Sequence, residues 1–425
     1  MDLPSKHVLN LSKRIGARGA ESDGEKSAAS YITHAFSDFD VDVDVETFSS
    51  WKSEYPAILI LFSCSILAYL AFYLNNALSL VISILVFILF QMETYSWAVV
   101  SRLLHKSGAS NIIGRVPPRE STKQTVLLVA NYDSFGSSPL GGPRLARAYR
   151  VLYIISFVSI IMIGLLGITG LGADLLKVSR HSIHLIWLFC VVFPAYLLIL
   201  TLLLAWGEVK GLFTAGANDN ASGVGVMLSL VATIAANPLE HTAVWGIATA
   251  RGAAGGRGMV ELLKKHSKTL RDAFIINLDH LGRGDTKVIT REGVMLGFSA
   301  SRRLTRLSFR AAKKSKSLKI TRGKNRVKKS DAMVANVRGY RAITIGGARG
   351  GTYDGWRSTD DTYDRIQRAS LDRAVKFVEA LLEEIDDLRS EAVDKKTPRR
   401  GRRKPSDLEA EAVEQAIKHL EEESP

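Results

Sequence analysis

Long uncharged apolar stretches alternate with polar segments along the chain. Four stretches approach or exceed the roughly 20 residues that a helix needs to cross a bilayer, and they predict membrane spans at 56–74, 78–99, 151–172 and 183–206. Aromatic residues mark their ends, as they do at membrane–water interfaces: Trp51, Tyr55, Tyr95, Trp97, Tyr149, Tyr153 and Trp206. Core helices of soluble proteins are seldom this long and free of charge, so we expect an integral, multi-pass membrane protein with the lipid bilayer as its partner.

The polar segments carry a different pattern, in which short apolar runs alternate with helical ones. The runs at 125–129, 242–248, 273–278 and 342–345 have the length of buried strands. Helical periodicity lies between and after them, as in the amphipathic segment 370–388. Strands that alternate with helices predict an α/β fold, here a mixed, mostly parallel sheet layered by helices.

This pattern predicts one polar domain that the spans interrupt twice. The expected order is the first part of the polar domain at 1–50, a transmembrane hairpin at 51–100, more of the domain at 101–148, a second hairpin at 149–207, the rest of the domain at 208–390, and a charged linker with a tail helix at 391–425. The hairpins are therefore insertions into one fold and do not separate two domains.

The charge distribution sets the expected orientation. The formal net charge is +14, and basic residues cluster where polar segments meet the spans, whereas the turn at Asn75 and Asn76 carries no charge. By the positive-inside rule, we predict that the polar domain and both termini face the cytoplasm. Cys64 and Cys190 both lie in predicted spans, so no disulfide framework is expected, which agrees with a reducing compartment.

Residues 301–329 form a strongly basic segment. Basic residues beside membrane spans are typical of contact with anionic lipid head groups, and a solvated loop is the alternative interpretation. Phe309 is the only aromatic residue in this segment, whereas single-stranded nucleic acid is bound by aromatic side chains that stack on its bases. We therefore expect no nucleic-acid partner.

One polar turn carries candidate chemistry. Asp219 lies among small residues and precedes an apolar helical pattern at 224–234, while Gly216 and Gly223 let the backbone bend closely around it. A carboxylate in such a turn is suited to hold a metal ion. An Asx-type turn that caps the following helix has the same pattern, so this stretch alone leaves both interpretations open.

Several motifs occur in a fixed order along the polar chain. They are two N-terminal helices, the strand 111–114, the Asp219 turn, Asn277-Leu278-Asp279 and the stretch 358–364. In this order they resemble the co-catalytic zinc aminopeptidases of clan MH, of the aminopeptidase Y and bacterial leucyl aminopeptidase type, from about residue 5 to residue 388. The resemblance implies the fold of these enzymes. It also implies a site where two histidines and three carboxylates hold two zinc ions beside a glutamate that acts as general base.

Most of the groups that this chemistry requires are replaced. The resemblance places two retained ligands at Asp219, which would bridge the metals, and Asp279, and it retains Asp133, which would orient the first histidine. The three other ligand positions and the position of the general base are held, in that order, by Asn131, Ala250, Arg357 and Thr249. Alanine cannot ligate, an Asn carbonyl is a poor zinc ligand, and arginine repels a cation.

We therefore expect no bound metal and no catalytic residue. The protein is interpreted as a membrane-embedded pseudopeptidase that acts as a binding or assembly platform for an unknown protein partner. The expected remnants of the cleft are Asp133, Asp219, Asp279 and Arg357. Without metal ions the carboxylates need another cation, so we predict that Arg357 hydrogen-bonds Asp219 or Asp279, with Arg251 as the second candidate.

The alternative is an active membrane-bound metallo-aminopeptidase with zinc in an altered site. His280 or Asp360 would then supply a missing ligand. His280 follows Asp279 on a strand, where successive side chains point to opposite faces. We therefore expect His280 to lie away from the cleft, as a surface or core histidine.

Overall fold

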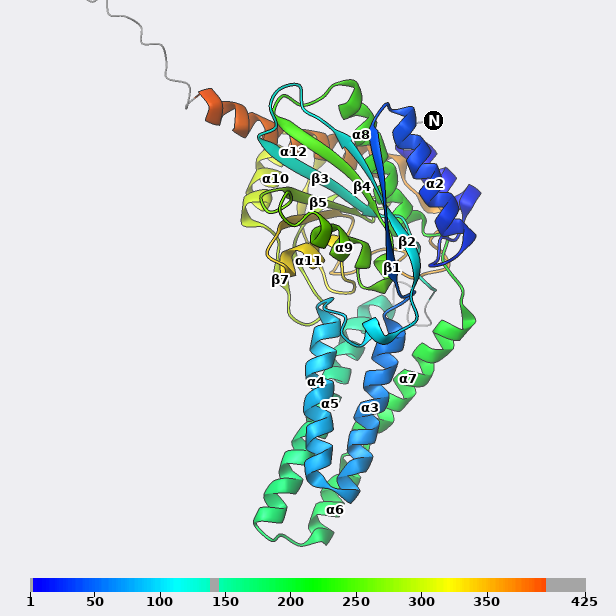
Figure 1. Cartoon of the computed structure of the whole chain (residues 1–425), viewed down its shortest axis with the longest axis vertical. Helices are drawn as coiled ribbons and strands as arrows, with labels where there is room; N and C mark the ends of the chain where they lie inside the picture. The colour runs from blue at the N-terminus through cyan, green and yellow to red at the C-terminus, as the bar shows by residue number, and fades with distance from the viewer. Residues whose placement is uncertain (1–2, 138–144, 395–425) are drawn as a thin grey trace, which may run out of the picture.

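The computed structural model describes residues 3–137 and 145–394. Figure 1 shows an α/β domain and a bundle of long helices that leaves one end of it. The chain passes from the domain into the bundle and back twice. Of the charged linker and tail helix expected at 391–425, the residues from 395 onward lie outside the described part of the chain.

One nine-stranded sheet runs through the domain. Its strands are β1 Asp42–Ser50, β2 Ser107–Val116, β3 Gln124–Asn131, β4 Thr242–Thr249, β5 Phe274–Asp279, β6 Lys287–Glu292, β7 Phe298–Ser299, β8 Thr321–Asn325 and β9 Arg341–Gly346. The strand order is β1-β2-β4-β3-β5-β9-β6-β7, with β8 paired to β6. The central strands β4, β3, β5 and β9 are parallel, and antiparallel strands flank them. The predicted α/β fold with a mixed sheet is confirmed.

Helices cover both faces of this sheet. The helices on one face are α1 (Leu3–Leu9), α2 (Asp23–Asp38), α8 (Ser222–Ala236), α10 (Arg302–Lys314) and α12 (Arg368–Asp394), and those on the other are α9 (Arg257–Lys265) and α11 (Asp331–Val337). Alternate residues of β3 divide between the two cores, with Val126 and Leu128 in the first and Leu127 and Val129 in the second. A strand that is covered on both faces is apolar throughout, which explains the continuous apolar run in β3.

The bundle has a core of its own. Its helices are α3 (Tyr55–Leu74), α4 (Asn76–Thr94), α5 (Leu145–Leu175), α6 (Arg180–Phe189) and α7 (Val192–Lys210), and we call them the apolar bundle. Leu61, Phe90 and Leu197 are buried between these helices, whereas Leu202 and other large apolar residues are exposed on the outside. An apolar exterior of this extent is typical of helices that face lipid.

Five described helical segments are long and apolar enough to cross a membrane: Tyr55–Leu74, Asn76–Thr94, Ala148–Leu175, His181–Lys210 and Ala217–Ala236. The first four correspond to the predicted spans, but the second ends at Thr94 and not at residue 99, and the fourth is interrupted after Phe189. The second ends early because Ser96 and Ala98 have φ angles of 59° and 52°, which an α-helix does not accommodate. The fifth contains α8 and is 78% buried, as a core helix of the domain.

Both excursions into the apolar bundle begin and end at neighbouring strands. β1 precedes α3 and β2 follows α4, and these two strands pair with Ser50 opposite Ser107. Likewise β3 precedes α5, and β4, which follows α8, pairs with β3. The carboxyl ends of β1 and β3 therefore lie at the end of the domain from which the apolar bundle leaves.

Candidate functional site

The polar residues predicted from the sequence gather at the carboxyl ends of the parallel strands. Asn131 ends β3 and is the register partner of Thr249 at the end of β4. Asp279 ends β5, and Asp219 reaches the same region from the turn before α8. Both carboxylates are buried, with 1% of each residue exposed. In open α/β sheets this edge is where ligands bind.

A second carboxylate fixes the Asp219 turn. Asp361 accepts hydrogen bonds from the backbone N–H groups of Asn218 and Asp219 at 2.8 and 2.9 Å. Gly216 has a φ of 59°, and a Cβ at this position would lie 2.7 Å from the Asp219 carbonyl oxygen, so the turn requires glycine there. The Asp219 side chain does not cap α8; its Oδ1 accepts from Lys328 instead. The turn does contain an Asx-type cap of α8, but through Asn220 and not Asp219, because Asn220 Oδ1 accepts from the Gly223 N–H at 3.2 Å.

A buried lysine lies between the two retained carboxylates. This residue is Lys328, and its Nζ lies 2.9 Å from Asp219 Oδ1 and 3.0 Å from Asp279 Oδ1. The Lys328 side chain is only 5% exposed, whereas the sequence predicts that the basic segment 301–329 lies in solvent or at lipid. One ammonium group thus compensates two carboxylates that would otherwise repel each other at close range.

Asn325, at the end of β8, organises the loop that carries Lys328. Its Oδ1 accepts from the N–H groups of Val327 and Lys328 at 3.2 and 3.3 Å, and its Nδ2 donates to the Lys328 carbonyl at 3.0 Å. The same Nδ2 donates to Glu292 Oε1 at 3.2 Å, which ties the loop to β6. Ser330 then caps α11 through its hydroxyl. The lysine is therefore fixed on both sides by local hydrogen bonds.

Burial and charge act against each other in this cluster. Burial alone would lower the pKa of Lys328, but the carboxylates of Asp219 and Asp279 raise that pKa above its ordinary value. Burial would raise the pKa of Asp279, but Lys328 and then His280 hold that pKa well below its ordinary value. Lys328 and Asp279 are therefore both charged at neutral pH. Nearby, burial raises the pKa of Glu292 to about 7.

His280 belongs to the cluster, so the expectation that it lies away from the cleft is wrong. Its Nδ1 lies 2.7 Å from Asp279 Oδ1, and its Nε2 lies 3.6 Å from Asp219 Oδ2. Strand alternation does not apply because β5 ends at Asp279, and His280 adopts the left-handed region with a φ of 56°. Its ring stacks on Tyr353 with the centroids 4.2 Å apart, which fixes its orientation.

The replaced positions make hydrogen bonds within the protein. Asn131 Nδ2 lies 3.3 Å from Asp133 Oδ1. Asp133 also accepts from two backbone N–H groups of the loop after β4, at 2.9 and 3.1 Å. Thr249 donates to Asp331 Oδ2 at 2.6 Å, and burial raises the pKa of this aspartate to about 6. Ala250 is fully buried. These contacts stabilise the strand ends directly.

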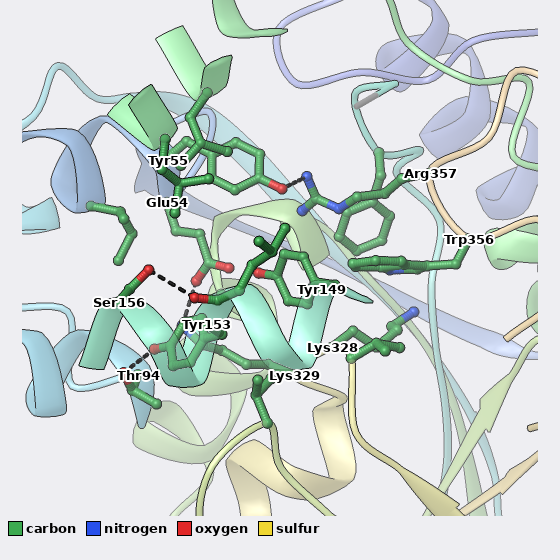
Figure 2. A pocket seen from close by; sticks show the side chains of 18 of the residues that line it. Glu54, Tyr55, Thr94, Tyr149, Tyr153, Ser156, Lys328, Lys329, Trp356 and Arg357 are labelled. Atoms are coloured by element: carbon green, nitrogen blue, oxygen red, sulfur yellow. Dashed lines mark hydrogen bonds and ion pairs between the residues drawn. The ribbon is translucent and has the colours of Figure 1, made fainter. Parts of the chain in front are cut away.

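The prediction for Arg357 is wrong. Its guanidinium donates to the Tyr55 hydroxyl on α3 (Figure 2). Among the described residues, the ion-pair partner of Asp219 and Asp279 at this end is Lys328 and not Arg357. It lies over the rings of Tyr55, Phe135 and Trp356, with the guanidinium carbon 4.6, 5.1 and 5.5 Å from the ring centroids. Arg357 adopts the left-handed region with a φ of 51°, and its side chain lies against Tyr55 of the apolar bundle.

Arg251 and Asp360 also pair with residues outside the cluster. Arg251, the second candidate for the cation, lies 3.4 Å from Glu25 and is fully buried. Asp360, considered as a replacement ligand, is exposed and lies 3.2 Å from Arg365. Neither residue contributes to the cluster around Lys328.

A two-zinc centre does not fit these residues. Zinc is held by imidazole, thiolate and carboxylate groups, and in the described part of the cleft such groups converge only in Asp219, Asp279 and His280, whose ligand atoms lie within 4.8 Å of one another. The Lys328 ammonium lies within hydrogen-bonding distance of two of these ligands. A divalent cation beside it would be repelled.

Lys328 and Asp331 complete the cluster but are absent from the sequence-based prediction of the site. The sequence contains one signal for Lys328. It lies with Lys329 between the apolar Val327 and the helix start Ser330-Asp331, whereas the basic residues of 302–326 lie on an amphipathic helix or in a polar run. A lysine between an apolar residue and a helix cap is better placed for burial than one on a charged helix face.

Comparisons with known proteins agree with this fold. Residues 204–382 match the sequence model of peptidase family M28. The zinc aminopeptidase BSAP from Bacillus subtilis superposes with a TM-score of 0.53 at 14% identity, and the match covers 90% of this chain and 94% of that one. No curated protein matches the chain in a sequence search.

Two proteins of Bacteroides thetaiotaomicron have the same fold. A leucine aminopeptidase precursor gives a TM-score of 0.53 at 15% identity, covering 89% of this chain and 95% of that one. A glutaminyl cyclase, solved with bound N-acetylhistamine, gives 0.53 at 15% identity, covering 89% and 96%. Residues 204–382 are therefore similar to peptidase family M28, and the chain has the zinc-aminopeptidase fold.

Proposed function

We propose that the protein is a non-catalytic, membrane-embedded member of this family, whose peptidase-like domain serves as a binding or assembly platform. The observation that carries the proposal is the buried Lys328 ammonium between Asp219 and Asp279. It supplies positive charge to the cleft without a Lewis acid that activates water. Asn131 and Thr249 support the same conclusion, because they replace an imidazole ligand and the general base with groups that perform neither role.

The apolar bundle supports a membrane location. We propose that its helices cross the bilayer as two hairpins, and that the α/β domain and both termini face the cytoplasm. Arg102 and Lys106 are exposed between the end of α4 and β2, which agrees with the excess of basic residues on cytoplasmic sides. The segments inserted into the domain are the long apolar helices, and the partner that such helices favour is the lipid bilayer.

The basic segment 301–329 gives weaker support to contact with anionic lipid head groups. α10 lies beside α12, in the half of the domain away from the apolar bundle (Figure 1). Arg310 and Lys314 each lie 2.7 Å from the buried Glu384 on α12. These basic residues therefore stabilise the domain, and we propose that lipid contact involves the bundle more than this segment.

Zinc content and peptidase activity together test the non-catalytic assignment. Purified protein that has been incubated with zinc and desalted is expected to retain no stoichiometric zinc by mass spectrometry and to release no product from aminoacyl anilides. Lys328→Ala removes the ammonium beside the ligands and is expected to increase zinc retention. Lys324→Ala, at an exposed position of the same segment, is the control. One or two zinc ions per wild-type chain, with turnover that a chelator abolishes, would contradict the proposal.

A second candidate function is a metallo-aminopeptidase with one zinc ion in an altered site. It is favoured by Asp219 Oδ2, Asp279 Oδ2 and His280 Nε2, which are buried and have no hydrogen-bond partner within the described structure. Zinc binding and turnover by the wild-type protein, both lost in His280→Gln, would favour this function over the first.

A further inference from the structure

A pocket joins the candidate site to the apolar bundle. Lys328, Trp356 and Arg357 line it from the domain and Tyr55 on α3 from the bundle (Figure 2). Leu204 on α7 also lines it from the bundle. The cavity itself has a volume of about 70 Å³, several times what one water molecule needs, and it continues into open space at its mouth. The cleft of the domain therefore opens toward the apolar helices.

The polar end of the pocket presents donors that lack acceptors. Arg357 Nε and Trp356 Nε1 have no hydrogen-bond partner in the described structure, although the two residues are only 7% and 2% exposed. Lys328 and Lys329 line the same end but are already paired with carboxylates. The Arg357 guanidinium has no ion pair among the described residues, and it donates to the neutral hydroxyl of Tyr55. Buried donors without acceptors are costly, so this end is complementary to an oxygen-rich anion.

The aromatic rings around Arg357 do not supply the missing acceptors. Tyr55, Phe135 and Trp356 attract the guanidinium charge through their rings. A ring does not replace an oxygen acceptor for the Nε proton, and the Trp356 N–H is itself without a partner in the described part of the chain. The rings therefore hold the arginine in position and leave its charge available to a ligand.

The other end of the pocket is lined by apolar side chains. Ile58 and Phe62 lie about one and two turns along α3 from Tyr55, and Leu152 on α5 and Leu200 on α7 face the same space. These helices form the bundle that we propose lies in the bilayer. A free anion would leave this surface unfilled, whereas a hydrocarbon chain would bury apolar area against it.

We propose that this pocket binds a single-chain amphiphile with an oxyanion head group, such as a long-chain carboxylate drawn from the membrane. The head group accepts hydrogen bonds from Arg357 and Trp356, and the chain lies among α3, α5 and α7. This inference uses the membrane location given in the proposed function. It does not depend on whether the domain is catalytic.

Binding of radiolabelled palmitate to the full chain in phosphatidylcholine nanodiscs tests the proposal. Trp356→Phe keeps the ring and removes one donor, so we expect about tenfold weaker binding. Arg357→Gln removes the charge, and we expect a loss on the order of a hundredfold. Leu200→Trp fills the chain end, away from the head group, and should abolish binding. Arg326→Gln, at an exposed arginine, should leave it unchanged, and thermal unfolding of each variant shows that it is folded.

Competitors identify the chemistry. Unlabelled palmitate and a one-chain lysophosphatidate should both displace the label, and the one that acts at the lower concentration identifies the head group. Hexadecanol, which has the chain without the charge, and inorganic phosphate, which has the charge without the chain, should displace it poorly.

Equal palmitate binding by wild type, Trp356→Phe and Leu200→Trp would overturn the proposal. Displacement by hexadecanol as readily as by palmitate would overturn the head-group contact, and efficient displacement by inorganic phosphate would reduce the pocket to a simple anion site. None of these measurements involves zinc or peptide turnover. Failure to bind palmitate therefore leaves the non-catalytic assignment unaffected. Conversely, a zinc-loaded protein that cleaves peptides and also binds palmitate would refute the non-catalytic assignment and leave the amphiphile pocket supported.

Discussion

Lys328→Met removes the ammonium and keeps a side chain of similar length and apolar stem. Asp219 and Asp279 lose their shared cation, at 2.9 and 3.0 Å, and remain 1% exposed. Removing one partner of a buried ion pair destabilises a protein by about 3–5 kcal/mol. The variant is therefore expected to fold but to be much less stable than the wild type at neutral pH.

Protonation of one carboxylate limits this loss and makes it depend on pH. Protonating an aspartate of ordinary pKa about 3.9 costs about 4 kcal/mol at pH 7 and about 1.5 kcal/mol at pH 5, at 1.36 kcal/mol per pH unit. The loss in Lys328→Met therefore shrinks as the pH falls. In the wild type, the lowered pKa of Asp279 and the raised pKa of Lys328 keep both groups charged between pH 5 and 8, so their contribution to stability is constant there.

Thermal unfolding from pH 5 to pH 8 measures this difference. Lys328→Met is compared with the wild type and with Lys324→Met, an exposed lysine on β8 whose loss should change stability by less than about 0.5 kcal/mol. A deficit of equal size at every pH, or a variant as stable as the wild type at pH 8, would refute the buried double ion pair.

Three further predictions follow from the same structure. Burial raises the pKa of Glu292 to about 7, above its ordinary 4.5. Its neutral form therefore stabilises the protein at low pH, and this contribution is lost as the pH rises through 7. Glu292→Gln should raise the free energy of unfolding by up to about 3 kcal/mol at pH 8 and by little at pH 4.5, as measured by unfolding at both pH values. Arg18 is fully buried and donates to five backbone carbonyls, so Arg18→Leu should destabilise the protein by about 3–5 kcal/mol, and a smaller loss in chemical unfolding would contradict its role. Lys324→Cys, in a chain with Cys64 and Cys190 replaced by Ala, should react with an impermeant maleimide only after cells are lysed; labelling of intact cells would reverse the proposed orientation.

The parts of the fold that depend on local pattern could be predicted from the sequence. Four spans correspond to helices of the apolar bundle because length and absence of charge are local properties. The run in β3 identifies a buried strand because both faces of that strand are covered. Asp219 and Asp279 could be placed because each follows a recognisable turn or strand.

The parts that depend on long-range contacts could not be predicted. Lys328 lies in a basic segment, and its burial follows from the pairing of β8 with β6 and from the hydrogen bonds of Asn325. His280 enters the cluster through a single left-handed residue at a strand end, which no period reveals. The partner of Arg357 is Tyr55 on α3, and no residue near Arg357 in the sequence indicates where that helix lies.

In the membrane arrangement that we propose, the pairing of the strands also fixes the parity of membrane crossings. β1 pairs with β2 and β3 pairs with β4 in one sheet, so the chain between each pair must return to the side of the bilayer that it left. α3 and α4 satisfy this condition as two crossings. Between β3 and β4, α5 is one crossing and α6 with α7 must count as one more, because a third crossing at α8 would leave β4 opposite its partner. Failure to insert one helix would therefore remove strands from the sheet, and membrane insertion and folding of the domain succeed or fail together.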